Sequence, residues 1–169
     1  DVNLSVKDEF TFQFIVVDNA NKCRFYKADT LDVTVKLYPP DNTGPTLLIA
    51  NLNQDVQMLN NHLTVELGQQ ITLGLSGVDP DNLPQPDFLR LELIKVEGEP
   101  ADGYVFAPAE GRKTVQTTFT WNPQCSIFAN DVYENDYTFT FRVVDDRCFN
   151  SKGDTLAVDI TIKDVERSD

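Results

Sequence analysis

The sequence is poor in the residues from which most catalytic sites are built. Among 169 residues there is one histidine, His62, and there are three cysteines. A lone histidine in a polar stretch forms neither a Ser-His-Asp arrangement nor a Cys/His metal cluster. No glycine-rich phosphate-binding loop follows a strand-like segment, and nothing singles out a glycosidase pair among the 27 acidic residues. We therefore expect the chain not to be an enzyme.

Positive charge and long apolar runs are also scarce. Fourteen lysine and arginine residues face 27 acidic ones, and the net charge is −13. Phosphate backbones would repel such a surface, so nucleic acid is not an expected partner. Cations are a natural partner, although the acids would serve equally as a solubilising surface. No apolar run reaches the roughly 20 residues of a membrane-spanning helix, so no transmembrane segment is expected. The absence of an initiating Met and of a signal peptide predicts a mature segment or a piece of a larger protein.

No segment carries the 3.6-residue apolar repeat of an amphipathic helix, and apolar residues alternate with period two instead. After two strands within residues 1–40, we expect strands at about 46–52, 63–67, 70–76, 88–96, 103–107, 113–121, 137–145 and 154–163. Their inward faces should carry Ile71, Leu73, Leu75, Leu89, Leu91, Leu93, Val115, Phe119, Trp121, Tyr137, Phe139, Phe141, Val143, Leu156, Val158, Ile160 and Ile162. This pattern predicts an all-β fold, an antiparallel immunoglobulin-like sandwich.

One stretch occurs twice. Residues 10–18 read FTFQFIVVD and residues 137–145 read YTFTFRVVD. Each copy is followed by a cysteine, Cys23 or Cys148, and six residues later by Asp-Thr-Leu. Such a repeat indicates two copies of one structural unit. In this overlay residue 1 lies opposite Phe128, so the equivalent of Cys125 would fall just before the chain begins.

The repeat divides the chain. Residues 1–40 are expected to be the C-terminal strands of a truncated repeat, residues 41–45 a linker, and residues 46–169 a complete sandwich. Three prolines between Pro39 and Pro45 make the joint short and stiff. Because two strands alone are marginal in water, the first piece should pack on strands that lie before residue 1 or in another chain.

Two family patterns match these residues. The run TFTWNPQC at 118–125, followed by 137–145 and Cys148, resembles tandem immunoglobulin-like repeats of large Bacteroidetes surface proteins, including adhesins and gliding-motility-associated proteins. The resemblance covers about 45–165 in full and 1–40 as a partial copy. A broader pattern is similar to cadherin, and it consists of Val144-Asp145, Ala157 to Ile162, Asp41-Asn42 with Pro45, and Asp79-Pro-Asp81. The cadherin element Leu-Asp-x-Glu is absent from the chain.

The cadherin-like pattern implies a calcium site. Because successive antiparallel strands alternate in direction, the linker, the loop after residue 78 and the loop after residue 145 should meet at one pole of the sandwich. The expected ligands are Asp41, Asn42, Asp79, Asp81, Asp145 and Asp146. Ca²⁺ takes six to eight oxygen ligands of this kind, and gathered carboxylates repel one another without a cation. The alternative is that Asp79 to Asn82 is simply a good turn.

Cys125 and Cys148 are predicted to form a disulfide, as suits an exported protein. The strand between them would hold the two loops nearly 30 Å apart at about 3.3 Å per residue, so residues 126–136 would have to run back along the sandwich. Two independent thiols are the alternative. Thr30 and Thr155, each in Asp-Thr-Leu, resemble Bacteroidetes O-glycosylation sites, with a strand start as the alternative.

The resemblance implies a non-catalytic spacer module of a secreted, outer-membrane-associated adhesin or gliding-motility-associated protein, in which repeats form a stiff filament. Neighbouring repeats of the same chain are the expected partners, with other surface proteins or glycans beside them. The alternative is a binding module whose loops hold a glycan or a protein. A third interpretation is a proteolytic or partly ordered piece of a larger assembly.

Overall fold

The structure is a computed structural model that describes residues 8–17, 28–38, 41–82, 86–98, 101–128, 132–147 and 150–164. The chain divides into two compact units, one comprising 1–41 with 148–150 and the other comprising 42–147 with 151–169. Almost all of the regular structure in the described residues is β-strand, and the exception is one 3₁₀ turn, η1 (Cys125–Ile127). Among the same residues, no helix has the length and apolar character that crossing a membrane requires.

The first unit contains one antiparallel hairpin, made of β1 (Glu9–Val17) and β2 (Ala28–Lys36). Phe12 lies opposite Val33 and Phe14 lies opposite Leu31. The Leu37 amide donates to the Asp8 carbonyl at 2.8 Å and extends the ladder by one step. Alternation of apolar and polar residues at this spacing places the apolar side chains of both strands on the same face.

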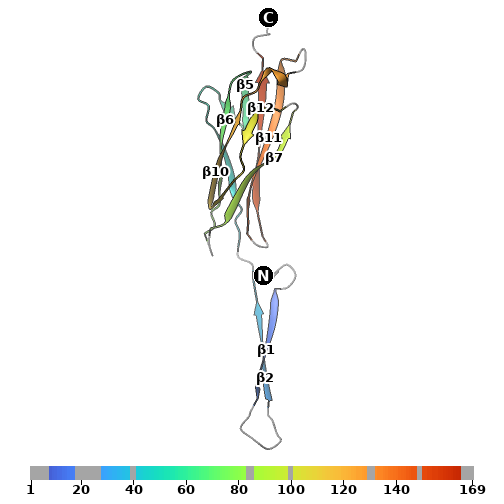
Figure 1. Ribbon diagram of the computed structural model, residues 1–169. Helices are drawn as coiled ribbons and strands as arrows, with labels where there is room; N and C mark the ends of the chain where they lie inside the picture. The colour runs from blue at the N-terminus through green and yellow to red at the C-terminus, as the bar shows by residue number, and fades with distance from the viewer. Residues whose placement is uncertain are drawn as a thin grey trace, which may run out of the picture. The chain divides into compact units, whose positions relative to one another are not determined.

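The second unit is a sandwich of two sheets, whose strands run along a common axis (Figure 1). The four-stranded sheet has the order β3 (Thr46–Asn51), β6 (Ile71–Val78), β10 (Thr114–Trp121) and β8 (Tyr104–Phe106). The six-stranded sheet has the order β4 (Met58–Leu59), β5 (His62–Glu66), β12 (Gly153–Lys163), β11 (Glu134–Asp145), β7 (Phe88–Glu97) and β9 (Ala109–Arg112). The predicted all-β, immunoglobulin-like sandwich is therefore confirmed.

Three details differ from the expected fold. β5 pairs with β12 in parallel, with Leu63 opposite Ile160, so the sheet is mixed rather than antiparallel. β4 and β9 have only two and four residues and were not predicted, because alternation is not recognisable over so short a run. β11 begins at Glu134, three residues before the expected start.

The core lies between the two sheets and is rich in aromatic side chains. Phe119 of β10 and Phe139 of β11 are fully buried, with ring centroids 4.7 Å apart. Trp121 packs edge-on against Tyr137 at 4.8 Å, and its indole N–H donates to the Asp102 carbonyl at 2.7 Å. Trp121 is thus a core residue with a satisfied donor, as expected. Of the predicted inward residues, only Leu93 and Leu156 are partly rather than fully buried.

At Gly77 of β6 the two sheets pack closely together. A Cβ atom at this position would lie 2.6 Å from Cγ2 of Val143 and 2.9 Å from Cγ1 of Val115. No real side chain fits at such distances, so the absence of a side chain at Gly77 lets β11 come close to β6. The repeat residue Val143 therefore fills the space above a glycine of the opposite sheet.

A buried charge cluster at one pole of the sandwich

The strand directions bring several loops together at one pole of the second unit. β6 ends at Val78 and β11 ends at Asp145, while β7 begins at Phe88 at the same pole. Lys113, between β9 and β10, adopts a left-handed conformation with φ +64°. Its N–H donates to the Asp87 carbonyl and its own carbonyl accepts from the Asp79 amide, each at 2.9 Å. Lys113 thereby fixes the backbone of two acidic residues side by side.

Arg147 is the cation of this cluster. Its Nη1 lies 3.1 Å from a carboxylate oxygen of Asp87, and its Nη2 lies 3.5 Å from one of Asp81. The Arg147 side chain is 7% exposed and that of Asp87 is 4% exposed. Burying a charged side chain costs a large desolvation free energy. The attraction between the two ions offsets this cost only when both are present. The guanidinium therefore supplies the positive charge that gathered carboxylates require.

Asp79 and Asp87 each keep one carboxylate oxygen without a hydrogen-bond partner. Asp79 Oδ1 accepts from the Asp81 amide at 2.7 Å, whereas its Oδ2 is buried and unpartnered, as is Oδ2 of Asp87. Burial raises the pKa of the Asp79 carboxyl, and the charges of Asp81 and Asp145 raise it further. Burial also raises the pKa of Asp87, against the opposing effect of Arg147. The two groups are held in an environment that favours their neutral forms.

Asp81 and Asp145 fasten the segment that leads into β3. The Thr43 amide donates to Asp81 Oδ2 at 2.8 Å, and this bond is the main reason that the pKa of Asp81 is lowered. The Asn42 side-chain amide donates to Asp145 Oδ2 at 2.9 Å, and the ammonium of Lys152 donates to the Asn42 carbonyl. The other oxygen of Asp145 accepts from the Lys152 and Arg147 amides. Because one partner in each of these hydrogen bonds is charged, they are stronger than hydrogen bonds between two neutral groups.

The structure gathers four of the six predicted metal ligands, Asn42, Asp79, Asp81 and Asp145. Asp146 is turned away, because its Oδ1 accepts from the Phe88 amide at 3.0 Å, while its own amide donates to the Phe88 carbonyl at 3.0 Å. Asp41 is exposed and belongs to the other compact unit. Asp87 and Arg147 were missed. The position of Asp87 directly before a strand that starts at this pole was the signal that would have found it.

The donor set of the cluster suits a hard cation. One carboxylate oxygen from each of Asp79, Asp81 and Asp87 lies within 4.8 Å of the others, and carboxylate oxygen is the ligand that Ca²⁺ prefers. Two of these carboxyl groups carry the unpartnered oxygens. The Arg147 guanidinium is paired with Asp81 and Asp87, so a bound calcium ion would have to share those two carboxylates with it.

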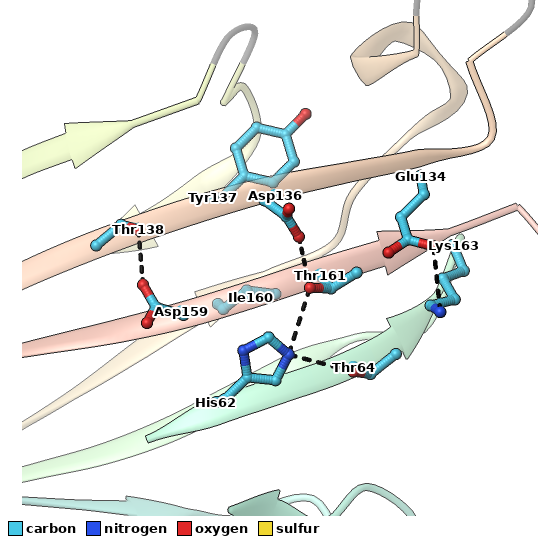
Figure 2. Close-up of a pocket in the computed structure, with 10 residues that line it drawn as sticks. All are labelled: His62, Thr64, Glu134, Asp136, Tyr137, Thr138, Asp159, Ile160, Thr161 and Lys163. Atoms are coloured by element: carbon cyan, nitrogen blue, oxygen red, sulfur yellow. Dashed lines mark hydrogen bonds and ion pairs between the residues drawn. The ribbon is translucent and has the colours of Figure 1, made fainter. Parts of the chain in front are cut away.

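A shallow groove lies on the outer face of the six-stranded sheet, over β5, β12 and β11 (Figure 2). Its volume is about 530 Å³, and its lining includes His62, Asp136, Asp159 and Thr161. The Thr161 hydroxyl donates to Asp136 at 2.6 Å, and its oxygen lies 3.3 Å from His62 Nε2. The single hydroxyl proton therefore points to the carboxylate rather than to the imidazole, so His62 is not positioned to accept it. His62 is exposed, as expected.

The predicted disulfide is not formed by Cys125, which carries a free, exposed thiol in η1. Its predicted partner, Cys148, lies outside the described residues. η1 is close to the start of β11, where the Asn135 side chain donates to the Ile127 carbonyl at 2.7 Å. Arg147 follows the far end of β11, after 12 strand residues at about 3.3 Å each. β11 therefore places η1 and Arg147 at opposite poles of the sandwich.

The two predicted glycosylation sites have the same local geometry. The Thr30 amide donates to the Asp29 side chain and the Thr155 amide donates to the Asp154 side chain, both at 2.9 Å. Both threonines are exposed and lie near the beginning of a strand. Asp154 also accepts from the Leu47 amide at 2.9 Å. Turn and strand-start chemistry therefore accounts for both aspartates.

Comparison with known proteins gave neighbours among solved structures only. No protein-family model matches the chain, and no curated protein matches it. One structural neighbour is AggA, the major subunit of aggregative adherence fimbriae type I from Escherichia coli, with a TM-score of 0.41 and 9% identity over 76% of this chain and 100% of that one. Another is the adhesin InvE from Yersinia pseudotuberculosis, with a TM-score of 0.32 and 11% identity over 90% of this chain and 49% of that one. The function of this chain is therefore inferred from its own residues.

Proposed function

We propose that the chain is a non-catalytic structural module of a secreted bacterial cell-surface protein of the adhesin or gliding-motility-associated type. In this proposal immunoglobulin-like units follow one another as stiff spacers, and neighbouring repeats of the same chain are the main partners. The sequence resemblance to tandem surface repeats supports the surface location. The exposed Thr30 and Thr155 remain proposed O-glycosylation sites under the same reading.

The proposal rests on the segment Asn42-Thr43, through which the chain enters the second unit and which we call the entry segment. Hydrogen bonds hold it to the sandwich. Asn42 is only 6% exposed; its side-chain amide nitrogen donates to Asp145, and its backbone carbonyl accepts from Lys152. Thr43 is held by Asp81. A segment tied down by three charge-assisted bonds within two residues bends much less than a free linker. A spacer needs this stiffness at the point where the chain enters a unit.

The course of the chain through the second unit also supports a spacer. The chain enters at the charge-cluster pole and leaves at the other, where the Asp164 amide donates to the Tyr133 carbonyl at 2.9 Å. A sandwich that is entered at one pole and left at the other adds its full length to a filament. Its packed aromatic core resists deformation along that length.

Calcium is the proposed cofactor of the charge-cluster pole. Its support is the carboxylate set of Asp79, Asp81 and Asp87 with two unpartnered, buried oxygens. A bound ion would add positive charge to a cluster that holds one guanidinium. The proposal requires that Arg147 and the ion share the same carboxylates.

The alternative is a glycan- or protein-binding module. The groove of Figure 2 favours it, because Asp136, Asp159 and His62 offer polar groups to a ligand. Among the described residues that line this groove, Tyr137 carries the one phenyl-type ring; it is 1% exposed and offers no open ring face for stacking on a sugar.

Small-angle scattering compares the two functions directly. The spacer role predicts that the wild-type profile fits a single fixed arrangement, and that Asp81→Ala with Asn42→Ala broadens the distribution of distances. Glu92→Ala removes the ion pair with Arg142 and none of the bonds to Asn42 or Thr43, so it should leave the profile unchanged. A wild-type profile of two freely jointed bodies would contradict the spacer, and specific binding on a glycan array would favour the alternative.

A further inference from the structure

The β1–β2 hairpin exposes a continuous apolar face. Phe12 is 53% exposed and Phe14 is 56% exposed, and Leu31 on the partner strand is 63% exposed. The same face also carries Phe10, Val16, Val33 and Val35, with Leu37 beyond the strand end. Side chains of this size are seldom left on a surface side by side without a binding partner.

The opposite face of the hairpin is largely polar and makes its own contacts. The hydroxyls of Thr11 and Thr34 lie 3.2 Å apart, and the Gln13 amide donates to Asp32 at 3.1 Å. The two faces are therefore built for different surroundings. One is suited to water, apart from Ile15 and Val17 near its end, and the other is suited to a core.

The hairpin repeats the register of β11–β12. Phe12 opposite Val33 corresponds to Phe139 opposite Val158, and Phe14 opposite Leu31 corresponds to Phe141 opposite Leu156. Five of the eight facing residues are identical, and the other three are close in shape. The eight correspondences are Phe10 with Tyr137, Phe12 with Phe139, Phe14 with Phe141, Val16 with Val143, Leu31 with Leu156, Val33 with Val158, Val35 with Ile160, and Leu37 with Ile162.

In the second unit this same face is buried by the four-stranded sheet. Phe139 and Phe141 are 0% exposed, and both contact Phe119 of β10. Val143 fits over Gly77 of β6. The same residues in the same register are thus buried in the β11–β12 hairpin and exposed to solvent in the β1–β2 hairpin.

We propose that the apolar face of β1–β2 is the docking surface for the remaining strands of an immunoglobulin-like repeat of the same type as the second unit. The partner is a polypeptide whose sheet presents large aromatic and aliphatic side chains to Phe12 and Phe14, and a glycine to Val16. The inference concerns the hairpin alone and does not depend on the spacer role.

The strand edges favour this partner over the hairpin of a second copy. In the second unit β11 pairs antiparallel with β7 and β12 pairs parallel with β5. A partner of the repeat type supplies both of these edge strands as well as the covering sheet. A second hairpin laid face to face would cover the apolar side chains but leave both edges open, and copies that each carry a net charge of −13 repel one another.

The test uses a complement made from the chain's own sequence. Residues 42–133 hold every described strand of the second unit except β11 and β12. A copy of them is fused directly before Lys7, the repeat equivalent of Glu134, and residues 7–169 follow. If the inference is right, the added copy takes β1–β2 as its missing hairpin. The amides of Phe12, Phe14 and Val33 should then exchange with solvent at least about a hundredfold more slowly than in the unfused chain.

Two double variants test which face of the hairpin is covered, and a reference fusion tests whether the added copy folds. Phe12→Asp with Phe14→Asp should abolish the protection, whereas Thr11→Asp with Gln13→Asp, on the opposite face, should keep it. A reference fusion that duplicates 42–164 shows whether the added copy folds in this position. Fast exchange of the hairpin amides beside a folded reference overturns the proposal. Sedimentation of the unfused chain as a dimer that Phe12→Asp dissociates also overturns it, because the occupant would then be a second copy.

Discussion

The Arg147 guanidinium lies 3.1 Å from the Asp87 carboxylate, and both side chains are buried. Clusters of carboxylates often bind metal ions, but in this cluster the Arg147 guanidinium already supplies a positive charge. Burial raises the pKa of Asp79 and of Asp87, while Asp81 and Asp145 remain strong acceptors for the entry segment. The pole thus combines an internal ion pair with bonds that hold the incoming chain.

Removing Arg147 should destabilise the second unit strongly. Arg147→Gln leaves Asp87 buried without its partner, and breaking a buried pair in this way costs about 3–5 kcal/mol of unfolding free energy. Urea unfolding followed by Trp121 fluorescence measures the change. Arg142→Ala is the matched control, because Arg142 pairs with Glu92 at 46% side-chain exposure and exposed pairs contribute about 0–1 kcal/mol. Equal effects of the two changes would contradict the assigned role of Arg147.

The stabilising effect of Asp79→Asn should depend on pH. Because the folded pKa of Asp79 is raised above its ordinary value of 3.8, its contribution to stability is complete below that value and is lost as pH rises through the folded pKa. The asparagine variant does not titrate. The stability of the variant relative to wild type, measured as the difference in unfolding free energy, should therefore be greater at about pH 7 than at about pH 4.

Asp81→Asn provides a control of opposite sign. The pKa of Asp81 is lowered, so its contribution is present above 3.8 and is lost as pH falls through the folded pKa. Relative to wild type, this variant should be less stable near neutral pH, and the difference should shrink in acid. Parallel curves for Asp79→Asn and Asp81→Asn would contradict the opposite shifts assigned to them.

Calcium should rescue the loss of Arg147 if the carboxylate set binds the ion. In Arg147→Gln the carboxylates of Asp81 and Asp87 are no longer paired with a guanidinium, so Ca²⁺ should bind more tightly than in wild type and should raise the melting temperature. Calorimetry with CaCl₂ measures the affinity, with NaCl at equal ionic strength as the control for screening. The absence of heat and of any melting shift in both proteins would rule out the calcium site.

Gly77→Ala should destabilise the sandwich by overpacking. The added Cβ would meet Val143 at 2.6 Å, and forced methyl groups in a packed core typically cost about 1–3 kcal/mol. Val143→Ala removes the clashing atom, so the double variant should lose less stability than the sum of the single ones. Thermal unfolding of the four proteins gives this coupling. If the stability losses of the two single variants simply added in the double variant, the side chains at positions 77 and 143 would not be in contact.

Cys125 should react with a maleimide in the folded, unreduced protein, because its thiol is free and exposed. Peptide mass spectrometry should find the label on the peptide that contains residue 125. The melting temperature of Cys125→Ser should equal that of wild type. Recovery of a Cys125–Cys148 cross-linked peptide from an unreduced digest would contradict the structure at this pole.

The strands and the inward faces were predictable from the sequence because alternation directly reports which side of a strand is buried. Leu73, Phe119 and Phe139 are fully buried as expected. Alternation does not report which strand lies beside which. The parallel pairing of β5 with β12 therefore could not be predicted, since the apolar pattern of His62 to Glu66 is the same in either direction.

The charge cluster was predictable in part. Strand directions placed Asn42, Asp79, Asp81 and Asp145 at one pole, and the structure brings these four together. Arg147 was missed because loop residues carry no periodic signal, and a side chain that turns into a cluster cannot be distinguished in sequence from one that faces solvent. The distance that the strand between the two cysteines imposes was also recognised from the sequence, and β11 has the length that this argument assumed.

The position of β12 has a mechanical consequence. β12 is the last strand of the second unit, and it is held between β11 on one side and β5 on the other. A pulling force between the two poles runs along its axis, so its backbone bonds to both neighbours are loaded in shear and must break together rather than unzip one by one. Because β5 runs parallel to β12, tension on the chain end drags β12 along its neighbours instead of peeling it away from the edge.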